Sequence, residues 1–375
     1  MNATRPALIM QRWNALQYDV LPELRAEVGV VTPKLERVIY VLEWARIEEF
    51  ADHCWDGIGR PPHVRAWLAN AFVAKAVLGI TTTVGLVERL VMDKTLRRIC
   101  GFRPFAKLPS EATFSRAFAQ FAEERLVERA YEAMIKEHLG DQLIGHISRD
   151  GTAIVARERP AAAANAAPAP RKKGKRKGKR PVKQAPPTAG SPIRRQRGQT
   201  LPDMLAELPT ICDRGTKCNA QGYKTSWNGY KLHIDTADCG VPIAALLCSA
   251  SMHDSRAAVP LSHITKQRVT NLYDVMDAAY CSKELHAHCR ELGHVPLIDH
   301  NARGGEKEHF EPADAVRYRE RSVAERTNAR LKDEFGGRNI MVKGHAKVMS
   351  HLMFGLLALG ADQLMRLRRC PDQTA

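Results

Sequence analysis

The sequence predicts an α/β protein in two parts, an N-terminal part made only of helices and a second part built on a mixed sheet. Three observations support this prediction. Apolar residues recur every three or four positions up to about residue 140, which is the period of a helix. From residue 143 onward, short β-branched runs and alternating apolar and polar residues are typical of strands. A segment dominated by Ala, Pro, Gly and Lys interrupts the second part and keeps no apolar period.

Residues 1–140 are expected to form a helical domain. In PPHVRAWLANAFVAKAVLG (61–79), apolar residues repeat every four positions after two prolines, and Thr83 can cap the next helix. In LPSEATFSRAFAQF, Ser110 can cap a third helix whose phenylalanines share a buried face, and Arg116 then points elsewhere. This pattern fits an ordinary bundle, or a helix-turn-helix-like module that contacts DNA through its polar face, Arg116 included.

Strands and helices alternate in the second part, and the first and fourth strands are expected side by side. The strands are LIGHISRDGTAIV, GYKLHIDTA, VPIAALLCSAS, NLYDVMDAAY and HVPLIDHN. Four helices are expected. The first ends at about Lys266, the second runs from Ser282 to Leu292, the third from Tyr318 to Phe335, and the last ends at about Leu367.

The positive charge is concentrated in the interrupting segment. The formal net charge is +16, and twelve Lys or Arg with no acid lie between Arg171 and Arg197, which leaves +4 for the rest of the chain. Residues 157–200 are expected to be disordered, because this composition cannot bury a core. Their expected partner is nucleic acid rather than a membrane, since no apolar helix face accompanies the charge. The candidate DNA-binding side chains are Lys172, Lys173, Lys175, Arg176, Lys177, Lys179 and Arg180.

Several classes of protein are excluded by what the sequence lacks. No signal peptide or membrane span is expected, and the most apolar stretch, 348–359, contains Ser350 and His351. Nine cysteines without C-x-x-C pairs suggest reduced thiols in a cytosolic protein. Neither G-x-G-x-x-G nor G-x-x-x-x-G-K occurs, and no small-molecule substrate is expected.

The charged segment YRERSVAERTNARLKDEF (318–335) carries four residues on one side. Tyr318, Arg321, Glu325 and Lys332 stand at offsets 0, 3, 7 and 14. On a helix of about 100° per residue they fall within an arc of roughly 60°. Arg321 and Glu325 could also form an ordinary surface ion pair between residues one turn apart, worth a few tenths of a kcal/mol.

Three acids distant in the sequence could converge at the ends of the strands. Phosphodiester cleavage by two metal ions needs carboxylates on rigid elements, and these carboxylates hold the two ions about 4 Å apart. Asp150 lies in the first strand of the sheet, Asp277 ends the fourth, and Glu325 lies on the helix after the fifth. Acids near strand ends are usually turn or cap residues. Five further acids therefore compete with these three: Asp235, Asp238, Asp254, Asp274 and Asp299.

The four residues Tyr318, Arg321, Glu325 and Lys332, which we call the stripe, resemble a known family signature. Tyr318-x2-Arg321-x3-Glu325-x6-Lys332 matches without a gap the Y-(2)-R-(3)-E-(6)-K signature of DDE transposases from bacterial insertion sequences. The likeness extends over most of residues 60–368, apart from the basic segment.

Four other stretches carry the same resemblance. SRDGTAI, with Asp150, resembles the first-aspartate strand of that family, and VMDAAYCS, with Asp277, resembles its second-aspartate motif. GYKLHIDTADCGVPIAALLCSASMHDS is similar to its second and third strands, and LPSEATFSRAF to part of its N-terminal domain.

The resemblance implies a ribonuclease H-like catalytic domain over residues 141–369, interrupted at 157–200, behind a helical domain that recognises DNA ends. It implies that Asp150, Asp277 and Glu325 bind two ions of Mg²⁺ or Mn²⁺. Arg321 and Lys332 would face the DNA backbone, and Tyr318 would lie near the cleaved end, so that all six residues serve catalysis.

The implied reaction is metal-dependent hydrolysis at transposon ends, followed by attack of the freed 3′-hydroxyls on target DNA. The implied partners are the terminal inverted repeats, the target DNA and a second copy of the chain, in the cytoplasm at the bacterial nucleoid. Two alternatives share the fold: a nuclease or resolvase that cuts without joining, and a catalytically silent DNA-binding protein derived from a transposase.

Overall fold

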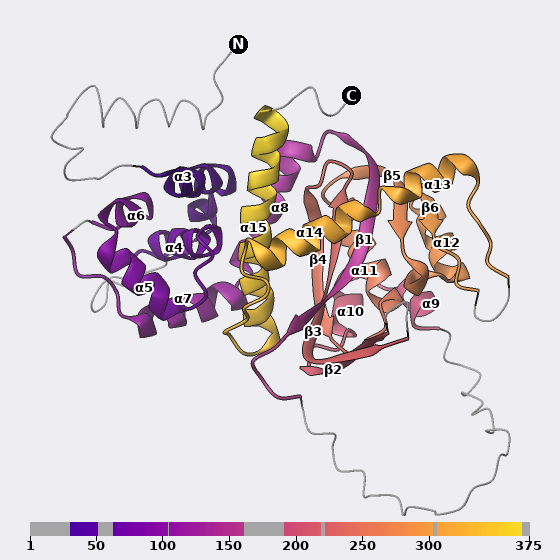
Figure 1. The fold of residues 1–375 in the computed structure, drawn as a ribbon, viewed down its shortest axis with the longest axis horizontal. Helices are drawn as coiled ribbons and strands as arrows, with labels where there is room; N and C mark the ends of the chain where they lie inside the picture. The colour runs from indigo at the N-terminus through magenta and orange to yellow at the C-terminus, as the bar shows by residue number, and fades with distance from the viewer. Residues whose placement is uncertain are drawn as a thin grey trace, which may run out of the picture.

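The N-terminal helices and the mixed sheet lie on opposite sides of one long helix. In the computed structural model the C-terminal helix α15 stands between them, with α3–α7 on one side and the sheet on the other (Figure 1). The structure describes residues 31–51, 63–103, 105–160, 191–218, 222–302 and 306–369.

The N-terminal part is helical throughout its described residues, as the sequence predicts. Thr82, rather than the expected Thr83, caps α5 by accepting a hydrogen bond from the Gly85 amide. Ser110 stands at the cap position of α7, but its hydroxyl contacts the Thr113 hydroxyl instead of the backbone. The elements are α3 (Pro33–Ala45), η2 (Ile47–Phe50), α4 (Arg65–Val77), α5 (Thr83–Met92), α6 (Lys94–Ile99), α7 (Glu111–Glu123) and α8 (Leu126–Leu139).

The sheet has six strands in the order β2-β3-β1-β5-β6, and β4 pairs with β3. As expected, β1 and β5, the first and fourth of the predicted strands, are parallel neighbours. The sequence analysis missed β2, a short polar strand that forms a hairpin with β3. The strands are β1 (Leu143–Val155), β2 (Asp213–Cys218), β3 (Lys224–Ala237), β4 (Pro242–Ser249), β5 (Thr270–Met276) and β6 (Val295–Ile298).

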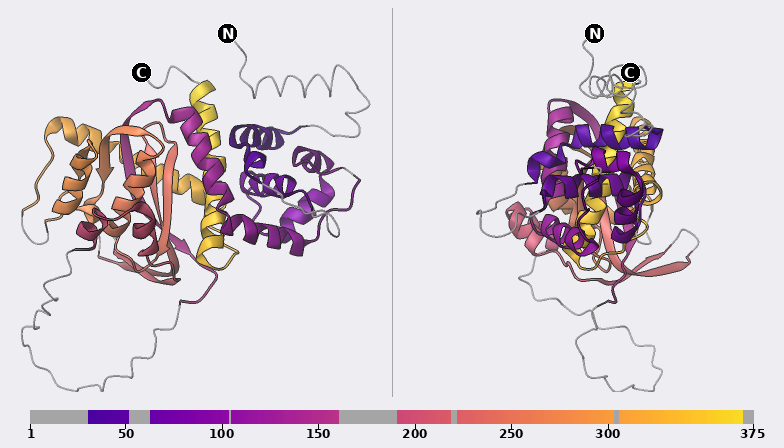
Figure 2. Two further views of the ribbon diagram at one scale, coloured as in Figure 1. Left: turned by 180° about the vertical axis from the view of Figure 1, so that it is seen from behind. Right: turned by 90° about the vertical axis from the view of Figure 1, so that its left-hand side faces the viewer.

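Helices cover both faces of this sheet. Along β3, Tyr230, Leu232 and Ile234 join the core shared with α15, while α11 packs over the opposite face. Figure 2 shows the sheet seen from behind, with α14 crossing it. The remaining helices are α9 (Pro192–Gln196), α10 (Leu201–Ala206), α11 (Ser255–Lys266), η3 (Ala278–Tyr280), α12 (Lys283–Glu291), α13 (Pro312–Arg319), α14 (Ser322–Asp333) and α15 (His345–Arg369).

Helix α15 joins the two parts through one continuous hydrophobic core. By length and composition it could cross a membrane, but 83% of its apolar window is buried inside the fold. A side chain at Gly355 would place its Cβ 2.7 Å from the backbone oxygen of Phe335, so glycine permits the close approach of α15 to the end of α14. The predicted packed terminal helix is therefore the central element of the core.

The predicted helix 318–335 is two helices. α13 ends at Arg319 and α14 begins at Ser322, and the amides of Arg321 and Ala324 bond to carbonyls three residues back. Such bonds tighten the turn. No Gly or Pro marks the break. It arises from packing, because α13 buries no side chain whereas α14 buries Val323 and Leu331 against the sheet.

The interruption of the second part is shorter than the expected 157–200. Glu158 accepts hydrogen bonds from the Tyr230 hydroxyl and the Gly344 amide, so the chain is ordered there. Ser191 caps α9, which buries Ile193, and the following Arg197 forms an ion pair with Glu291. The segment is polar overall, as its composition indicates, but the composition did not predict that Ile193 is buried or that Ser191 caps a helix. Residues 161–190 lie outside the described residues.

Candidate active site

Asp150 and Asp277 lie at the same level of two neighbouring strands. The parallel register pairs Arg149 of β1 with Met276, the last residue of β5, so Asp150 is the next residue of β1 and Asp277 is the first residue after β5. Register partners on adjacent strands point to the same face and lie about 5 Å apart along the hydrogen-bonding direction. The sheet therefore brings together the two aspartates that the sequence analysis singled out.

Both carboxyl groups are held in surroundings that disfavour their charge. Burial raises the pKa of Asp150 and the Asp277 carboxylate adds to the rise, whereas Lys217 and Arg321 lower it. Burial likewise raises the pKa of Asp277, although the Ala279 amide donates to that carboxylate at 3.0 Å. Each aspartate would thus gain from a nearby cation.

The five competing acids already have partners. Asp235 receives two hydrogen bonds from buried Arg149, each 2.7 Å long, and Asp274 pairs with His294 at 2.9 Å. Asp238 accepts from the Gly145 amide, and Asp254 and Asp299 pair with Lys231 and Lys307. In the described part of the chain, Asp150 and Asp277 accept only from an amide and form no ion pair. Asp150 and Asp277 thus differ from the four acids that pair with basic side chains, whereas Asp238 also accepts only from amides.

Helix α14 lies across β1 and is bonded to it at two points. The Asn328 side-chain amide donates to Oδ2 of Asp150 at 2.9 Å, and Lys332 Nζ donates to the Thr152 hydroxyl at 2.6 Å. Four residues of helix rise about 6 Å and two residues of strand about 6.6 Å, so the two bonds are in register. This match fixes the position of α14 along the strand.

Glu325 lies one helical turn before Asn328 but does not touch the aspartates. Its carboxylate accepts from Arg321 at 2.6 Å, and 55% of the Glu325 side chain is exposed. This is the ordinary surface ion pair between residues one turn apart that the sequence analysis gives as the alternative interpretation of the stripe. Among the described residues, no group of three or more His, Cys, Asp or Glu is placed to hold a metal ion.

Arg321 lies at the break between α13 and α14, and Tyr318 lies near the end of α13. The positive charge of Arg321 lowers the pKa of both Asp150 and Asp277 and so favours their ionised forms. Tyr318 stacks at a tilt on Phe310, and burial raises its pKa to about 12, so its hydroxyl stays protonated at neutral pH.

Beneath the aspartates the sheet is held by buried polar contacts. The Tyr280 hydroxyl bonds to Nδ1 of His233 at 3.0 Å, and both side chains are fully buried. Burial lowers the pKa of His233 to about 4, so the ring is neutral at neutral pH. Arg149 and Asp235, on the same strands, form their ion pair at 1% and 0% exposure. These contacts make the floor of the site rigid.

Divalent metal fits two of the three expected ligands as they stand. Carboxylate oxygens are the ligands that Mg²⁺ and Mn²⁺ prefer. Asp150 and Asp277 present such oxygens without a neutralising partner, and a bound cation would relieve the cost of their burial. Glu325 is 55% exposed and paired with Arg321, so it would have to leave that pair to bind a metal at the aspartates.

Sequence reasoning missed two residues near the acids. Asn328 lies three residues after Glu325 and four before Lys332, so its place on the stripe was available from the spacing alone. Lys217 had no signal, because the strand β2 that carries it was not predicted. Lys217 is exposed, and its charge lowers the pKa of both aspartates.

The expected DNA-binding residues outside this site are only partly described. Arg116 is exposed on α7, opposite the buried Phe114 and Phe118, as predicted. The basic residues Lys172, Lys173, Lys175, Arg176, Lys177, Lys179 and Arg180 lie outside the described residues.

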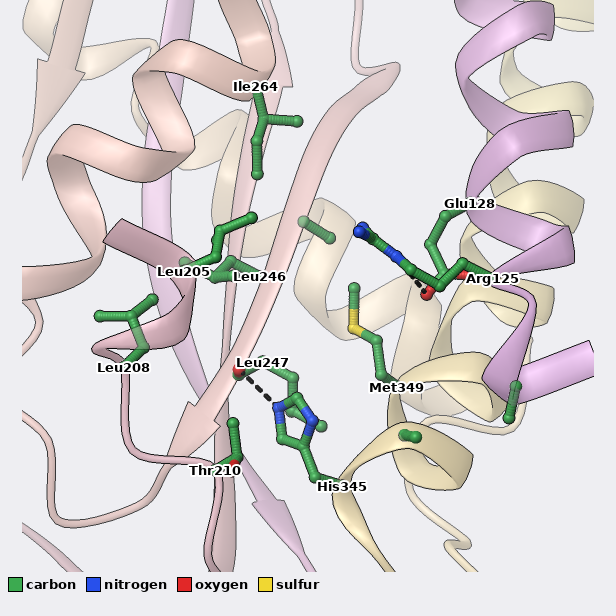
Figure 3. A pocket seen from close by; sticks show the side chains of 13 residues that line it. Arg125, Glu128, Leu205, Leu208, Thr210, Leu246, Leu247, Ile264, His345 and Met349 are labelled. Carbon is green, nitrogen blue, oxygen red and sulfur yellow. Dashed lines mark hydrogen bonds and ion pairs between the residues drawn. The ribbon is translucent and has the colours of Figure 1, made fainter. Parts of the chain in front are cut away.

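A cavity of about 240 Å³ lies away from the aspartates, between β4, α8, α10 and α15. Figure 3 shows its largely apolar lining, with Arg125 and Glu128 reaching in from α8 and His345 donating to the Leu247 carbonyl. None of the expected site residues lines this cavity.

Comparison with known proteins places both parts of the chain. A family model described as "Transposase DDE domain" matches residues 206–360, and one described as "Transposase domain (DUF772)" matches residues 23–120. The first range contains Asp277 and Glu325 and begins after Asp150. No curated protein matches the chain.

One solved structure is similar, a "Mos1 transposase paired-end complex with left transposon end". It is 12% identical, and the alignment covers 89% of this chain and 99% of that chain at a TM-score of 0.18. The family assignment therefore depends on the two family models and not on this likeness.

Proposed function

The chain belongs to the DDE transposases of insertion sequences, and we propose that Asp150, Asp277 and Glu325 are the three acids of its active site. A transposase of this type is an enzyme that cuts DNA at the ends of its element and transfers the cut strand to target DNA. Its catalytic part has the ribonuclease H-like α/β fold and uses divalent metal.

The observation that carries the proposal is the level register of Asp150 and Asp277 on β1 and β5. It supplies two carboxylates about one strand spacing apart, and neither has a cation partner among the described residues. Helix α14 is fixed against β1 by the Asn328 and Lys332 bonds, and Glu325 lies one helical turn before Asn328, the residue that bonds to Asp150.

The metal would be two ions of Mg²⁺ or Mn²⁺. When bound, two ions stabilise the attacking and the leaving oxygen of a phosphodiester. Asp150 and Asp277 would hold them from the sheet, and Glu325 would complete the set from α14. Asp150 and Asp277 are suited to this role because β1 and β5, the strands at whose ends they lie, are parallel neighbours.

The other stripe residues would bind and orient the DNA strand. A Glu325 carboxylate that turns to metal releases the Arg321 guanidinium, which can then grip a phosphate with two parallel hydrogen bonds. Lys332 offers a compact charge for the next phosphate. Tyr318 keeps its proton and can donate a hydrogen bond near the cleaved end.

The two parts would divide the work on DNA. The helical domain, residues 1–140 with Arg116, would recognise the terminal inverted repeats, and the catalytic domain, residues 141–369, would cut them. The basic segment around Lys172–Arg180 would add contacts to phosphates. A homodimer would cut both ends together, in the cytoplasm and at the nucleoid.

The test is cleavage and joining of a labelled duplex that carries the DNA flanking the gene, with Mg²⁺ or Mn²⁺. Wild type would be compared with Glu325→Gln and with Glu320→Gln, an exposed acid at the break between α13 and α14. We expect nicks at the repeat ends and joined products from wild type and Glu320→Gln, and neither from Glu325→Gln, with DNA binding retained.

Other outcomes would separate the alternatives. Nicks without joined products would indicate a nuclease, and binding without any cutting would indicate a silent DNA-binding protein. Cutting by Glu325→Gln at the wild-type rate would remove Glu325 from the active site.

A further inference from the structure

One folded segment has a larger net positive charge than the whole chain outside the basic insert. Between Lys94 and Arg116 there are six Lys or Arg and one acid, Glu111, a net charge of +5. The whole chain outside Arg171–Arg197 has a net charge of +4. The remainder of the chain is therefore close to neutral, and this segment stands out as a site for a polyanion.

This segment consists of α6, the connection that follows it and the first turns of α7. We call its exposed side the α6–α7 surface. Lys94, Arg103, Lys107 and Arg116 are exposed, Arg98 is half-buried, and in the described part of the chain none of these five forms an ion pair. Charges that are not neutralised within the fold remain available to a partner.

The surface is held in a defined shape. Asp93 caps α6 by accepting from the Leu96 amide at 2.8 Å, and Arg97 donates to the Ala106 carbonyl at 2.6 Å. Gly101, at φ +98°, turns the chain against Trp67, where a Cβ would come within 2.4 Å of the indole. The connection between α6 and α7 is thus fastened to the bundle and needs little ordering on binding.

An aromatic side chain lies among these cations. The Phe105 side chain is 78% exposed, and Lys94 Nζ lies 4.9 Å from the centre of its ring. Met92, at the end of α5, is 83% exposed nearby in the sequence. Cations around an exposed aromatic ring suit nucleic acid, because phosphates take the charges while a base or sugar takes the ring.

We propose that the α6–α7 surface binds the DNA duplex at the transposon ends. Lys94, Arg103, Lys107 and Arg116 contact phosphates of the duplex. Phe105 packs against the sugar or base edge between them. The proposal builds on the function proposed above, since it assigns the surface through which that enzyme grips its DNA.

The test compares two full-length variants that each lose three exposed lysines or arginines. The surface variant carries Lys94→Gln, Arg103→Gln and Lys107→Gln. The control carries Lys34→Gln, Lys266→Gln and Lys283→Gln, which are exposed on α3, α11 and α12 and unpaired among the described residues. Circular dichroism would check that all proteins are folded.

Binding to a fluorescent end duplex would be measured by anisotropy across a range of salt concentrations. Each lost phosphate contact lowers the slope of log K against log salt by about 0.9, so we expect the surface variant to lose about 2.7 and the control to lose none. Phe105→Ala is expected to weaken binding without changing the slope, because the ring carries no charge.

An unchanged slope and affinity in the surface variant would refute the proposal, as would equal losses in the control. An acidic protein partner would give that same unchanged DNA binding. Cutting separates this from failure of the active site: the control variant should keep the wild-type cutting rate, whereas Glu325→Gln should lose it. If Glu325→Gln cuts normally, the active-site proposal fails and the binding results still decide the surface.

Discussion

Asn328 offers the sharpest test of how the site is built, because its two side-chain ends make opposite contributions. Its amide nitrogen donates to Asp150 at 2.9 Å, while its buried Oδ1 has no partner. Asn328→Leu removes both groups at similar volume. The lost bond to a carboxylate costs about 1.5–3 kcal/mol, and relief of the unpaired oxygen returns about 1–3 kcal/mol. The free energy of unfolding should therefore change little.

Metal affinity should respond quite differently to the same substitution. A partner that orients a metal-binding carboxylate typically contributes a factor of about 10–100 in metal affinity. We therefore expect Mn²⁺ to bind Asn328→Leu about 10–100 times more weakly, measured by isothermal titration calorimetry on the free protein. Thermal unfolding in EDTA should stay within about 2–4 °C of wild type, the shift that ~1 kcal/mol produces in a domain of roughly 150–250 residues, which is the size of the catalytic part.

Thr327→Val is the matched control, since Thr327 is a buried neighbour on α14 whose hydroxyl forms no hydrogen bond with Asp150 among the described residues. It should leave Mn²⁺ binding unchanged. Unaltered Mn²⁺ affinity in Asn328→Leu would refute the positioning role. A collapse of its melting temperature would instead show that the amide matters mainly to folding.

Three further predictions concern pH and charge. Burial raises the pKa of Asp150 and Asp277 above the usual 3.8, so the protonated carboxyl groups stabilise the fold at low pH, and this stabilisation is lost as pH rises through the raised pKa values. At pH 7, Asp150→Asn and Asp277→Asn should therefore each raise the melting temperature in EDTA. A lower melting temperature would contradict this. Burial lowers the pKa of His233 and His288 from 6.5 to about 4, so the stabilisation by each neutral ring is present above pH 6.5 and is lost toward pH 4, at about 1.4 kcal/mol per pH unit. In denaturant unfolding across that range, the free energy of unfolding should depend less steeply on pH in His288→Leu than in wild type. An identical pH dependence would show that other groups titrate there. Deleting 171–197 should weaken DNA binding and flatten its salt dependence, while an unchanged salt slope would show that the segment is only a spacer.

The positions of the proposed site residues could be predicted in part from the sequence, because they depend on fixed spacing and on strand order. Asp150 and Asp277 end up level because β1 and β5 are parallel neighbours, which follows from the order of the strands. The helical period alone placed Arg321, Glu325 and Lys332 on one side of the chain. The family signature assigned these same positions before the fold was known.

What the sequence could not predict depends on tertiary packing. The break at Glu320 has no Gly or Pro to announce it, and it appears because α14 packs on the sheet while α13 does not. Lys217 reaches the acids only because a polar hairpin strand pairs with β3. The Arg321 pairing of Glu325 is likewise a choice between two partners, which spacing cannot decide.

The central claim is that Asp150, Asp277 and Glu325 share bound metal. The most direct measurement is anomalous scattering from crystals of the protein with Mn²⁺ and an end duplex. We expect Mn²⁺ peaks between the Asp150 and Asp277 carboxylates, with Glu325 turned from Arg321 to a metal and Arg321 on a phosphate. Mn²⁺ bound elsewhere, or Glu325 still paired with Arg321 beside occupied metal sites, would contradict the assignment.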